Sequence, residues 1–163
     1  LQPLSDLCDH IEQSHHQYLR EQLPRLDRLI EKVVAAHGAR HPELAGLAAT
    51  FRALAAELSP HLMKEEQILF PAIRRLEGED STPRFPFGSV QNPIRVMEDE
   101  HDAAGRLLHD LRQMTDGYTP PQDACETWKQ LLRGLHELEL DLHQHIHKEN
   151  NLLFPAAARL EAR

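Results

Sequence analysis

The sequence predicts an all-α protein, an up-down-up-down four-helix bundle. Three observations lead to this fold class. The composition is rich in leucine, alanine, glutamate and arginine and includes only 7 glycines in 163 residues, which favours helix. Apolar residues recur at helical spacing in four segments, and none of these segments shows the alternation typical of a strand. Glycine and proline break the chain at residues 37–42, 78–93 and 115–121, so most connections should be short.

The first two predicted helices flank the break at residues 37–42. The first begins near Ser5, which we expect to act as its N-cap, and Pro24 should kink it. The second extends from about Pro42 to Glu77. Their apolar faces include Leu19, Leu23, Leu26, Leu29, Ile30 and Val33 in the first and Leu47, Phe51, Leu54, Leu58, Leu62, Ile68 and Leu69 in the second.

The last two predicted helices each begin with a capping signal. Asn92 precedes a proline, as a cap residue before the first helical position often does. Thr119 precedes two prolines, and Gln122 stands where a capping box places Glu or Gln. The apolar faces include Ile94, Met97, Leu108 and Leu111 in the third helix and Trp128, Leu131, Leu135, Leu138, Leu142, Leu152 and Leu153 in the fourth.

Charge and cysteine usage exclude several classes of protein. The net charge is −8 and no run of Lys or Arg occurs, so a nucleic-acid or anionic-membrane partner is not expected. No apolar run approaches the roughly 20 residues of a membrane-spanning helix. Cys8 and Cys125 are far apart and form no CxxC motif, which indicates reduced thiols in a cytoplasmic protein. We expect residues 1–163 to form one domain.

A histidine–glutamate motif occurs twice. HLMKEEQILFP begins at His61, and HIHKENNLLFP begins at His145. When residues 61–77 are aligned with residues 145–161, ten of the 17 positions are identical. In both copies a glutamate, Glu65 or Glu149, follows the histidine by four residues, which places the two side chains on one helix face. This is the face that carries the apolar residues, including Leu58, Ile68 and Leu69 in the first copy and Leu142, Leu152 and Leu153 in the second.

These inward polar groups predict a cation. A buried carboxylate is very costly unless it is paired or bound to metal, and no Lys or Arg shares either face convincingly. The first helix adds His16, in register with Leu19 and Leu23, although His15 is the alternative if the register is off by one. The third helix adds His101, four residues after Met97.

The size of the ligand set indicates two metal ions. Four histidines and two glutamates are too many for one tetrahedral zinc, but they suit two ions of the iron class, with manganese also tolerated. Glu65 and Glu149 would then bridge the two ions, as carboxylates do in the interior of dinuclear bundles. Pro71 and Pro155, six residues after these glutamates, should bend the helix ends.

Four further acidic residues are candidates for orienting the ligands or lining a channel: Glu57, Asp141, Glu98 and Glu100. A solvated surface position is an equally good interpretation of each of these four residues. Met63 and Met97 are expected in the core, as is Trp128. We expect the remaining histidines on the surface, namely His10, His37, His41, His109, His136, His143 and His147.

Several of these motifs resemble a known family. HLMKEEQILFP, SVQNPIRVMEDEHDAAG, TPPQDACETWK, HIHKENNLLFP and REQLP resemble the iron–sulfur cluster repair (RIC) di-iron proteins, which contain a hemerythrin-like (HHE) four-helix domain. The resemblance covers essentially the whole chain. It implies two non-haem irons with oxo, hydroxo or water between them. The implied terminal ligands are His16, His61, His101 and His145, and the implied bridges are Glu65 and Glu149.

The resemblance also implies a function. Family members act in nitrosative and oxidative stress defence and repair damaged iron–sulfur clusters by iron delivery, so iron–sulfur proteins are the implied partners. A nitric-oxide-binding or -reducing enzyme, or a hemerythrin-type O2 or redox sensor, are the alternatives, with NO or O2 as ligand. The small N-terminal domain with a cysteine pair that full-length members carry is not found in these residues. Oxygen-carrying hemerythrins use five histidines, so four should leave more open positions and favour reactivity or iron release.

Overall fold

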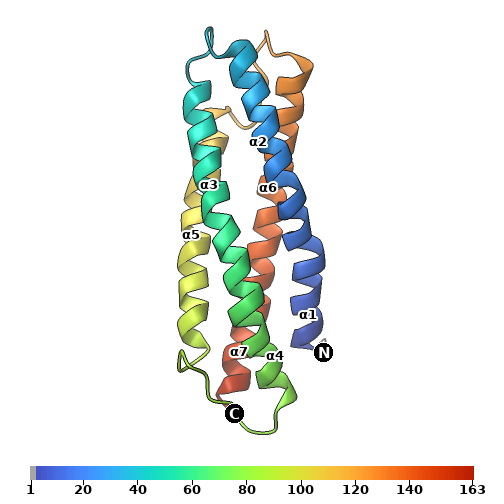
Figure 1. Cartoon of the computed structure of the whole chain (residues 1–163), viewed down its shortest axis with the longest axis vertical. Helices are drawn as coiled ribbons and strands as arrows, with labels where there is room; N and C mark the ends of the chain where they lie inside the picture. The colour runs from blue at the N-terminus through green and yellow to red at the C-terminus, as the bar shows by residue number, and fades with distance from the viewer. Residues whose placement is uncertain (1–2) are drawn as a thin grey trace.

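The computed structural model describes residues 3–163 and confirms the all-α four-helix bundle (Figure 1). Each of the four rods is a helix or a continuous series of helical segments. The first consists of α1 (Leu4–Ile11), the π-helical turn η1 (Glu12–His16) and α2 (Gln17–His37), and the second of α3 (Leu44–Lys64), η2 (Glu65–Leu69) and α4 (Phe70–Gly78). The third is α5 (Gln91–Met114), and the fourth consists of α6 (Glu126–His147), η3 (Lys148–Leu153) and α7 (Phe154–Glu161).

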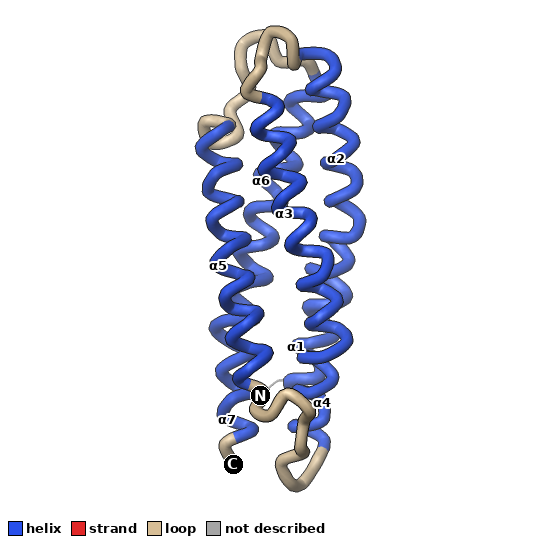
Figure 2. Tube along the Cα trace, turned by 60° about the vertical axis from the view of Figure 1, so that its left-hand side comes forward, coloured by secondary structure: helices blue, strands red, loops and turns tan. Residues whose placement is uncertain are grey.

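The connections lie at both ends of the bundle. The loop between α2 and α3 and the loop between α5 and α6 lie together at one end, and residues 79–90 cross the other end (Figures 1 and 2). Within the bundle α3 packs against α5, α2 against α6, and α2 against α3. Among the helices of residues 3–163, none has both the length and the apolar character needed to cross a membrane.

The apolar core has two parts. The larger part contains residues of α2, α3, α5 and α6, with Trp128 buried as predicted. The smaller part contains residues of α1, α4, α5 and α7, including Met97, which is 2% exposed. The buried histidines lie between the two parts with Glu65 and Glu149, whereas buried Glu139 lies beside the larger part, where it pairs with Arg112. The prediction that Met63 is a core residue is wrong, because this side chain is 53% exposed on the outer face of α3.

Three π-helical turns interrupt the rods near the polar layer. η2 ends at Leu69 and η3 ends at Leu153, so Pro71 and Pro155 each stand two residues after a π turn. The N–H of Phe70 donates to the carbonyl of Glu65, and the N–H of Phe154 donates to the carbonyl of Glu149. Both bonds follow the i→i+5 pattern of a π turn.

The π turns change which residues face the core. Leu69 and Phe70 are buried, whereas Ile68 is 48% exposed. The second copy repeats this, with Leu153 buried and Leu152 49% exposed. The prediction that Ile68 and Leu152 face the core is therefore wrong. A π turn is wider than an α turn, so the inward position falls one residue later than α-helical spacing indicates.

Glu77, and not Ser5, caps the first rod. Helix α1 begins at Leu4 without a side-chain cap from within its own segment. The Glu77 carboxylate accepts the N–H groups of Leu4 and Ser5, at 2.5 and 3.0 Å. These are amides that a helix start leaves unsatisfied.

The predicted caps of the last two rods are also wrong. Helix α5 begins one residue before Asn92, and the Glu161 carboxylate accepts the N–H of Val90 at 2.8 Å. Helix α6 begins at Glu126, because the residues after Thr119 form a turn of their own in which Ala124 N–H donates to the Pro121 carbonyl. Glu77 and Glu161 are the equivalent last residues of the two repeat copies, and each stabilises the start of another rod.

Candidate metal centre

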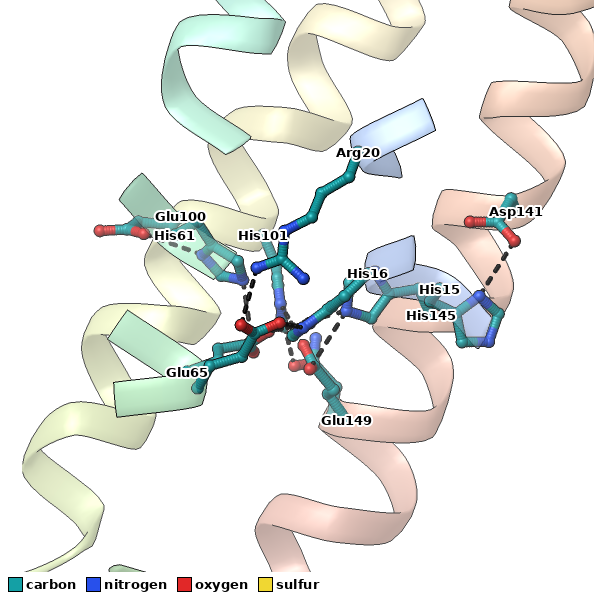
Figure 3. A network of polar contacts seen from close by, with 12 residues as sticks. His15, His16, Arg20, His61, Glu65, Glu100, His101, Asp141, His145 and Glu149 are labelled. Carbon is teal, nitrogen blue, oxygen red and sulfur yellow. Dashed lines mark hydrogen bonds and ion pairs between the residues drawn. The ribbon is translucent and has the colours of Figure 1, made fainter. Parts of the chain in front are cut away.

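The fold brings the six predicted ligands together in the polar layer between the two apolar clusters (Figure 3). All six are at most 5% exposed. His16 ends η1, His61 lies near the end of α3, Glu65 begins η2, His101 lies in α5, His145 lies near the end of α6, and Glu149 lies in η3. Three of the six therefore belong to π-helical turns, which occur frequently at functional sites.

The six residues form two groups that share both carboxylates. One group contains His16 and His145 and the other contains His61 and His101, and Glu65 and Glu149 belong to each. Within each group, one ligand atom from every residue lies within 4.8 Å of all the others.

The two oxygens of Glu65 face different groups. Oε1 lies 2.9 Å from His16 Nε2 and 3.7 Å from His145 Nε2. Oε2 lies 3.3 Å from His61 Nε2. One carboxylate thus offers an oxygen to each group.

Glu149 repeats this arrangement. Its Oε1 lies 2.8 Å from His101 Nε2, and its Oε2 lies 3.2 Å from His145 Nε2. Two carboxylates divided in this way could bridge a pair of metal ions.

Unsatisfied buried atoms support a metal at the second group. His61 Nε2, His101 Nε2, Glu65 Oε2 and Glu149 Oε1 are all buried, and although each nitrogen lies close to a carboxylate oxygen, none of the four atoms forms a hydrogen bond within residues 3–163. Buried polar atoms are rarely left in this state, because their desolvation is costly. The four atoms converge, so one cation could accept a lone pair from each. Nitrogen and carboxylate oxygen donors without sulfur suit iron or manganese.

Carboxylates and imidazoles shift each other's pKa in the centre. Burial raises the pKa of Glu65, but the neighbouring imidazoles of His145, His16 and His61 outweigh it and hold this pKa well below its usual value. Burial lowers the pKa of His145, but the Glu149 and Glu65 carboxylates raise it to about 10. Glu65 is therefore ionised beside the protonated imidazole of His145. A metal ion would replace these protons with its own positive charge.

Two of the histidines are oriented by residues at the same repeat position. The Nδ1–H of His16 donates to Glu66 Oε2 at 2.7 Å, and Arg20 donates to the other oxygen of Glu66, also at 2.7 Å. The Nδ1–H of His101 donates to Asn150 Oδ1 at 2.8 Å. In both cases Nε2 is left as the inward donor atom. Glu66 and Asn150 each follow a shared glutamate directly, so the two copies differ here in charge.

Aromatic rings support the same two histidines. The His16 ring stacks on Phe70 with centroids 5.7 Å apart, and the His101 ring stacks on Phe154 with centroids 6.0 Å apart. These phenylalanines are again equivalent residues of the two copies. Each copy thus holds a histidine from a rod outside the repeat.

His61 is oriented by Glu100, one of the four predicted outer residues. The Nδ1–H of His61 donates to Glu100 Oε1 at 2.8 Å, and Lys64 Nζ lies 2.5 Å from Oε2. Burial raises the pKa of Glu100, but Lys64 and His61 lower it further, so its net shift is downward. Glu100 is therefore an anionic acceptor beside the second group.

His145 has a different environment. Its Nδ1 is buried without a partner, and its ring stacks on His15 with centroids 5.2 Å apart. The Nδ1–H of His15 donates to Asp141 Oδ1 at 3.0 Å, and Lys148 donates to His15 Nε2 at 2.7 Å. His15 is thus buried but is not in either group.

The other predicted outer residues are placed differently. Asp141 contacts His15 and no member of the two groups by hydrogen bond. Glu57 borders a small closed cavity next to the centre. Within the described chain, Glu98 forms no hydrogen bond or ion pair with the six residues. Glu66 and Asn150 were not among the predicted site residues, although their place directly after Glu65 and Glu149 was a usable signal.

The closed cavity touches three of the four histidines. It has a volume of about 10 Å³, comparable to the space of one water molecule. Its remaining wall is mostly apolar. The lining residues are His61, His101, His145, Glu57, Glu100, Leu58, Ala104, Leu142 and Ile146.

Comparison with known proteins agrees with this site. Residues 9–157 match the model of the family described as hemerythrin HHE cation binding domain. The chain is 46% identical over 160 residues to the iron-sulfur cluster repair protein YtfE of Yersinia pseudotuberculosis serotype IB (strain PB1/+). It shows the same identity to the protein of that name from Yersinia pestis (strain Pestoides F). Each alignment covers 98% of this chain and 68% of the relative.

Proposed function

The chain belongs to the hemerythrin HHE cation-binding family, and we propose that it is a non-haem di-iron protein that repairs damaged iron–sulfur clusters by supplying iron. The single observation that carries the dinuclear site is the division of the carboxylate oxygens of Glu65 and Glu149 between two histidine pairs. The repair role is supported by the 46% identity to proteins named for cluster repair.

The ligand set suits an iron donor. His16 and His145 would hold one iron and His61 and His101 the other, with both glutamates shared. Ferrous iron stands low in the affinity order of divalent metals, and the site contains no cysteine that would bind it more tightly. Iron held by these nitrogen and oxygen donors can therefore be passed to a thiolate-rich acceptor.

Elemental analysis of protein purified without added metal tests the centre. We expect about two irons per chain and a clear loss in His61→Ala and Glu149→Ala. His136→Ala changes an exposed histidine outside the two groups and should leave the iron content unaltered. No iron, or one zinc that is indifferent to the ligand substitutions, would contradict a di-iron site.

An iron-transfer assay tests the repair role. Iron-loaded protein is mixed with a cluster-free iron–sulfur protein, sulfide and a thiol reductant, and cluster absorbance is followed. We expect cluster formation that the His61→Ala variant does not support. Full iron loading without any transfer would contradict the proposed repair function but would be consistent with the proposed metal site.

The closed cavity favours a second candidate function, binding and reduction of nitric oxide. A cavity with apolar walls beside His61, His101 and His145 suits a small uncharged molecule. Coupling two NO molecules consumes two electrons and two protons and gives nitrous oxide and water, and a diferrous centre would supply both electrons. Gas analysis after anaerobic NO exposure tests this, with Ala104→Val as a variant that fills the cavity. Binding without nitrous oxide would reject the reductase.

A further inference from the structure

A large solvent-open groove lies along the seam between α5 and α6. Its volume is about 880 Å³. Most of the residues that line it have a polar side chain, and several of these could bind metal, although most of them lie outside the centre. These are His101, His109, His143, His147, Asp102 and Asp110.

The groove and the closed cavity share a wall. His101 and Ile146 line both spaces. His101 Nε2 is one of the buried atoms that have no hydrogen bond, and it belongs to the group that also contains His61. The groove therefore lies next to this candidate metal position, with the His101 ring and the half-buried Ile146 side chain in the wall that the two spaces share.

The chemistry of the groove suits a cation in passage. His109 and His143 are exposed, and neutral imidazole and carboxylate are ligands for ferrous iron. Arg106 adds one positive charge, which Asp102 and Asp110 oppose. Apart from the two groups of the centre, the described residues contain no set of three metal-binding side chains that converge. Iron would thus be bound weakly in the groove and could pass through it.

A second cavity, on the seam of α3 and α5, is less suitable. Its volume is about 510 Å³, and none of the six candidate ligands lines it. On that side Lys64 and Glu100 form an ion pair in front of His61. The carboxylates of Glu57, Asp99 and Glu100 outnumber this ammonium group, so the cavity is less suitable because no histidine lines it and not because of its charge.

We propose that the α5–α6 groove is the route by which ferrous iron enters and leaves the centre, with His109 and His143 as transient ligands and Ile146 as the apolar barrier. This inference rests on the proposed role of the protein as an iron donor. It adds the path of the released iron, which would leave the position held by His61 and His101 and pass Ile146 and Gly105 on its way to solvent.

Gly105 offers a way to block the groove. It lies in the groove wall, and a Cβ placed there would meet no atom within 4 Å. Gly105→Phe should therefore occupy the groove without disturbing the backbone. Gly46→Phe is the matched control, since Gly46 is an exposed helical glycine of α3 whose added Cβ would meet only Met114, at 3.9 Å.

The experiment follows ferrous iron as it leaves the fully loaded chain. Loaded protein is mixed anaerobically with an excess of a coloured ferrous chelator, and the rate of colour formation is recorded. We expect Gly105→Phe and the double variant His109→Ala/His143→Ala to release iron about tenfold more slowly. Ile146→Ala should release it faster, and Gly46→Phe should match the unsubstituted chain. Iron content at equilibrium should be the same in all five proteins.

The outcomes separate this inference from the function on which it rests. Equal release rates in the unsubstituted chain, the double histidine variant and Gly105→Phe, at equal iron content, would overturn the route and leave the iron centre in place. If Gly105→Phe holds less iron at equilibrium, its release rate is not comparable, and the release rate of His109→Ala/His143→Ala then tests the route. A chain that holds no iron would instead reject the proposed function itself.

Discussion

Glu65 and Glu149 occupy equivalent positions in the two copies of the repeat, and each turns one carboxylate oxygen towards each histidine pair. This relationship makes the centre nearly symmetric although the chain is a single polypeptide. The symmetry extends to Phe70 and Phe154, which each stack on a histidine from another rod. A substitution of a shared residue should therefore affect both metal positions.

Glu65→Gln tests whether the carboxylate is shared. The variant replaces an anionic ligand of both positions, so we expect its iron content to fall from about two per chain almost to zero. His101→Gln removes a ligand of one position and should retain about one iron. Elemental analysis measures both, and circular dichroism checks that the helices persist. Equal iron in the two variants would mean that Glu65 serves one ion only.

Glu100→Ala tests the outer partner of His61. The substitution leaves the Nδ1–H of His61 without its carboxylate acceptor and so makes Nε2 a weaker donor. We expect iron affinity to fall by about tenfold or more, the usual effect of losing such a partner. Competition with a chelator measures the affinity. Glu98→Ala lies on the same helix without a contact to the centre, so an equal loss in that variant would argue for a general charge effect.

The sequence was sufficient to predict the bundle and the six converging side chains. Helical periodicity carries this information, since a residue that shares a face with Leu58 or Leu142 must point into the bundle. The repeat strengthened the inference, because His61 with Glu65 and His145 with Glu149 have the same spacing.

The inward positions beyond the glutamates could not be predicted in the same way. Ile68 and Leu152 follow α-helical spacing but lie outside, because a π turn shifts the inward position by one residue. Helix starts were missed for another reason. Glu77 caps α1 from more than seventy positions away, and such a contact exists only once the rods have packed.

Glu77→Ala tests this long-range cap. It leaves the N–H groups of Leu4 and Ser5 without their acceptor, so we expect a loss of about 1 kcal/mol in the free energy of unfolding. Urea denaturation measures the change. Glu79→Ala removes a nearby glutamate whose carboxylate pairs with Arg75 at the surface, and it should change stability far less. An equal loss in both variants would argue against the cap.

The same cap should weaken in acid. Burial raises the pKa of Glu77, but the N–H groups of Ser5 and Leu4 lower it further, so its folded pKa lies below the ordinary value. A carboxyl group with a depressed folded pKa stabilises the protein above the unfolded pKa of about 4.3 and loses this effect as pH falls through the folded pKa. The stability difference between Glu77→Ala and the unsubstituted chain should therefore shrink in acid.

The stabilising contribution of His41, at the other end of the bundle, should depend on pH in the opposite sense to that of Glu77. It lies in the loop between α2 and α3, with Nδ1 3.0 Å from Glu43 Oε1 and Nε2 2.8 Å from Asp123 Oδ2. Both nitrogens can donate only in the imidazolium form. The hydrogen bonds to Asp123 and Glu43 therefore raise the pKa of His41 above its ordinary value.

The sign of the effect follows from this shift. A histidine whose folded pKa is raised stabilises the protein fully below the unfolded pKa of about 6.5, and the effect is lost as pH rises through the folded pKa. The melting temperature of His41→Ala should thus fall below that of the unsubstituted chain at about pH 5.5, with little difference at about pH 9. Both proteins contain the same candidate metal centre, so its own pH dependence cancels in the comparison. A difference that persists unchanged at the higher pH would mean that His41 stabilises the loop through packing near Trp128 and not through its charge.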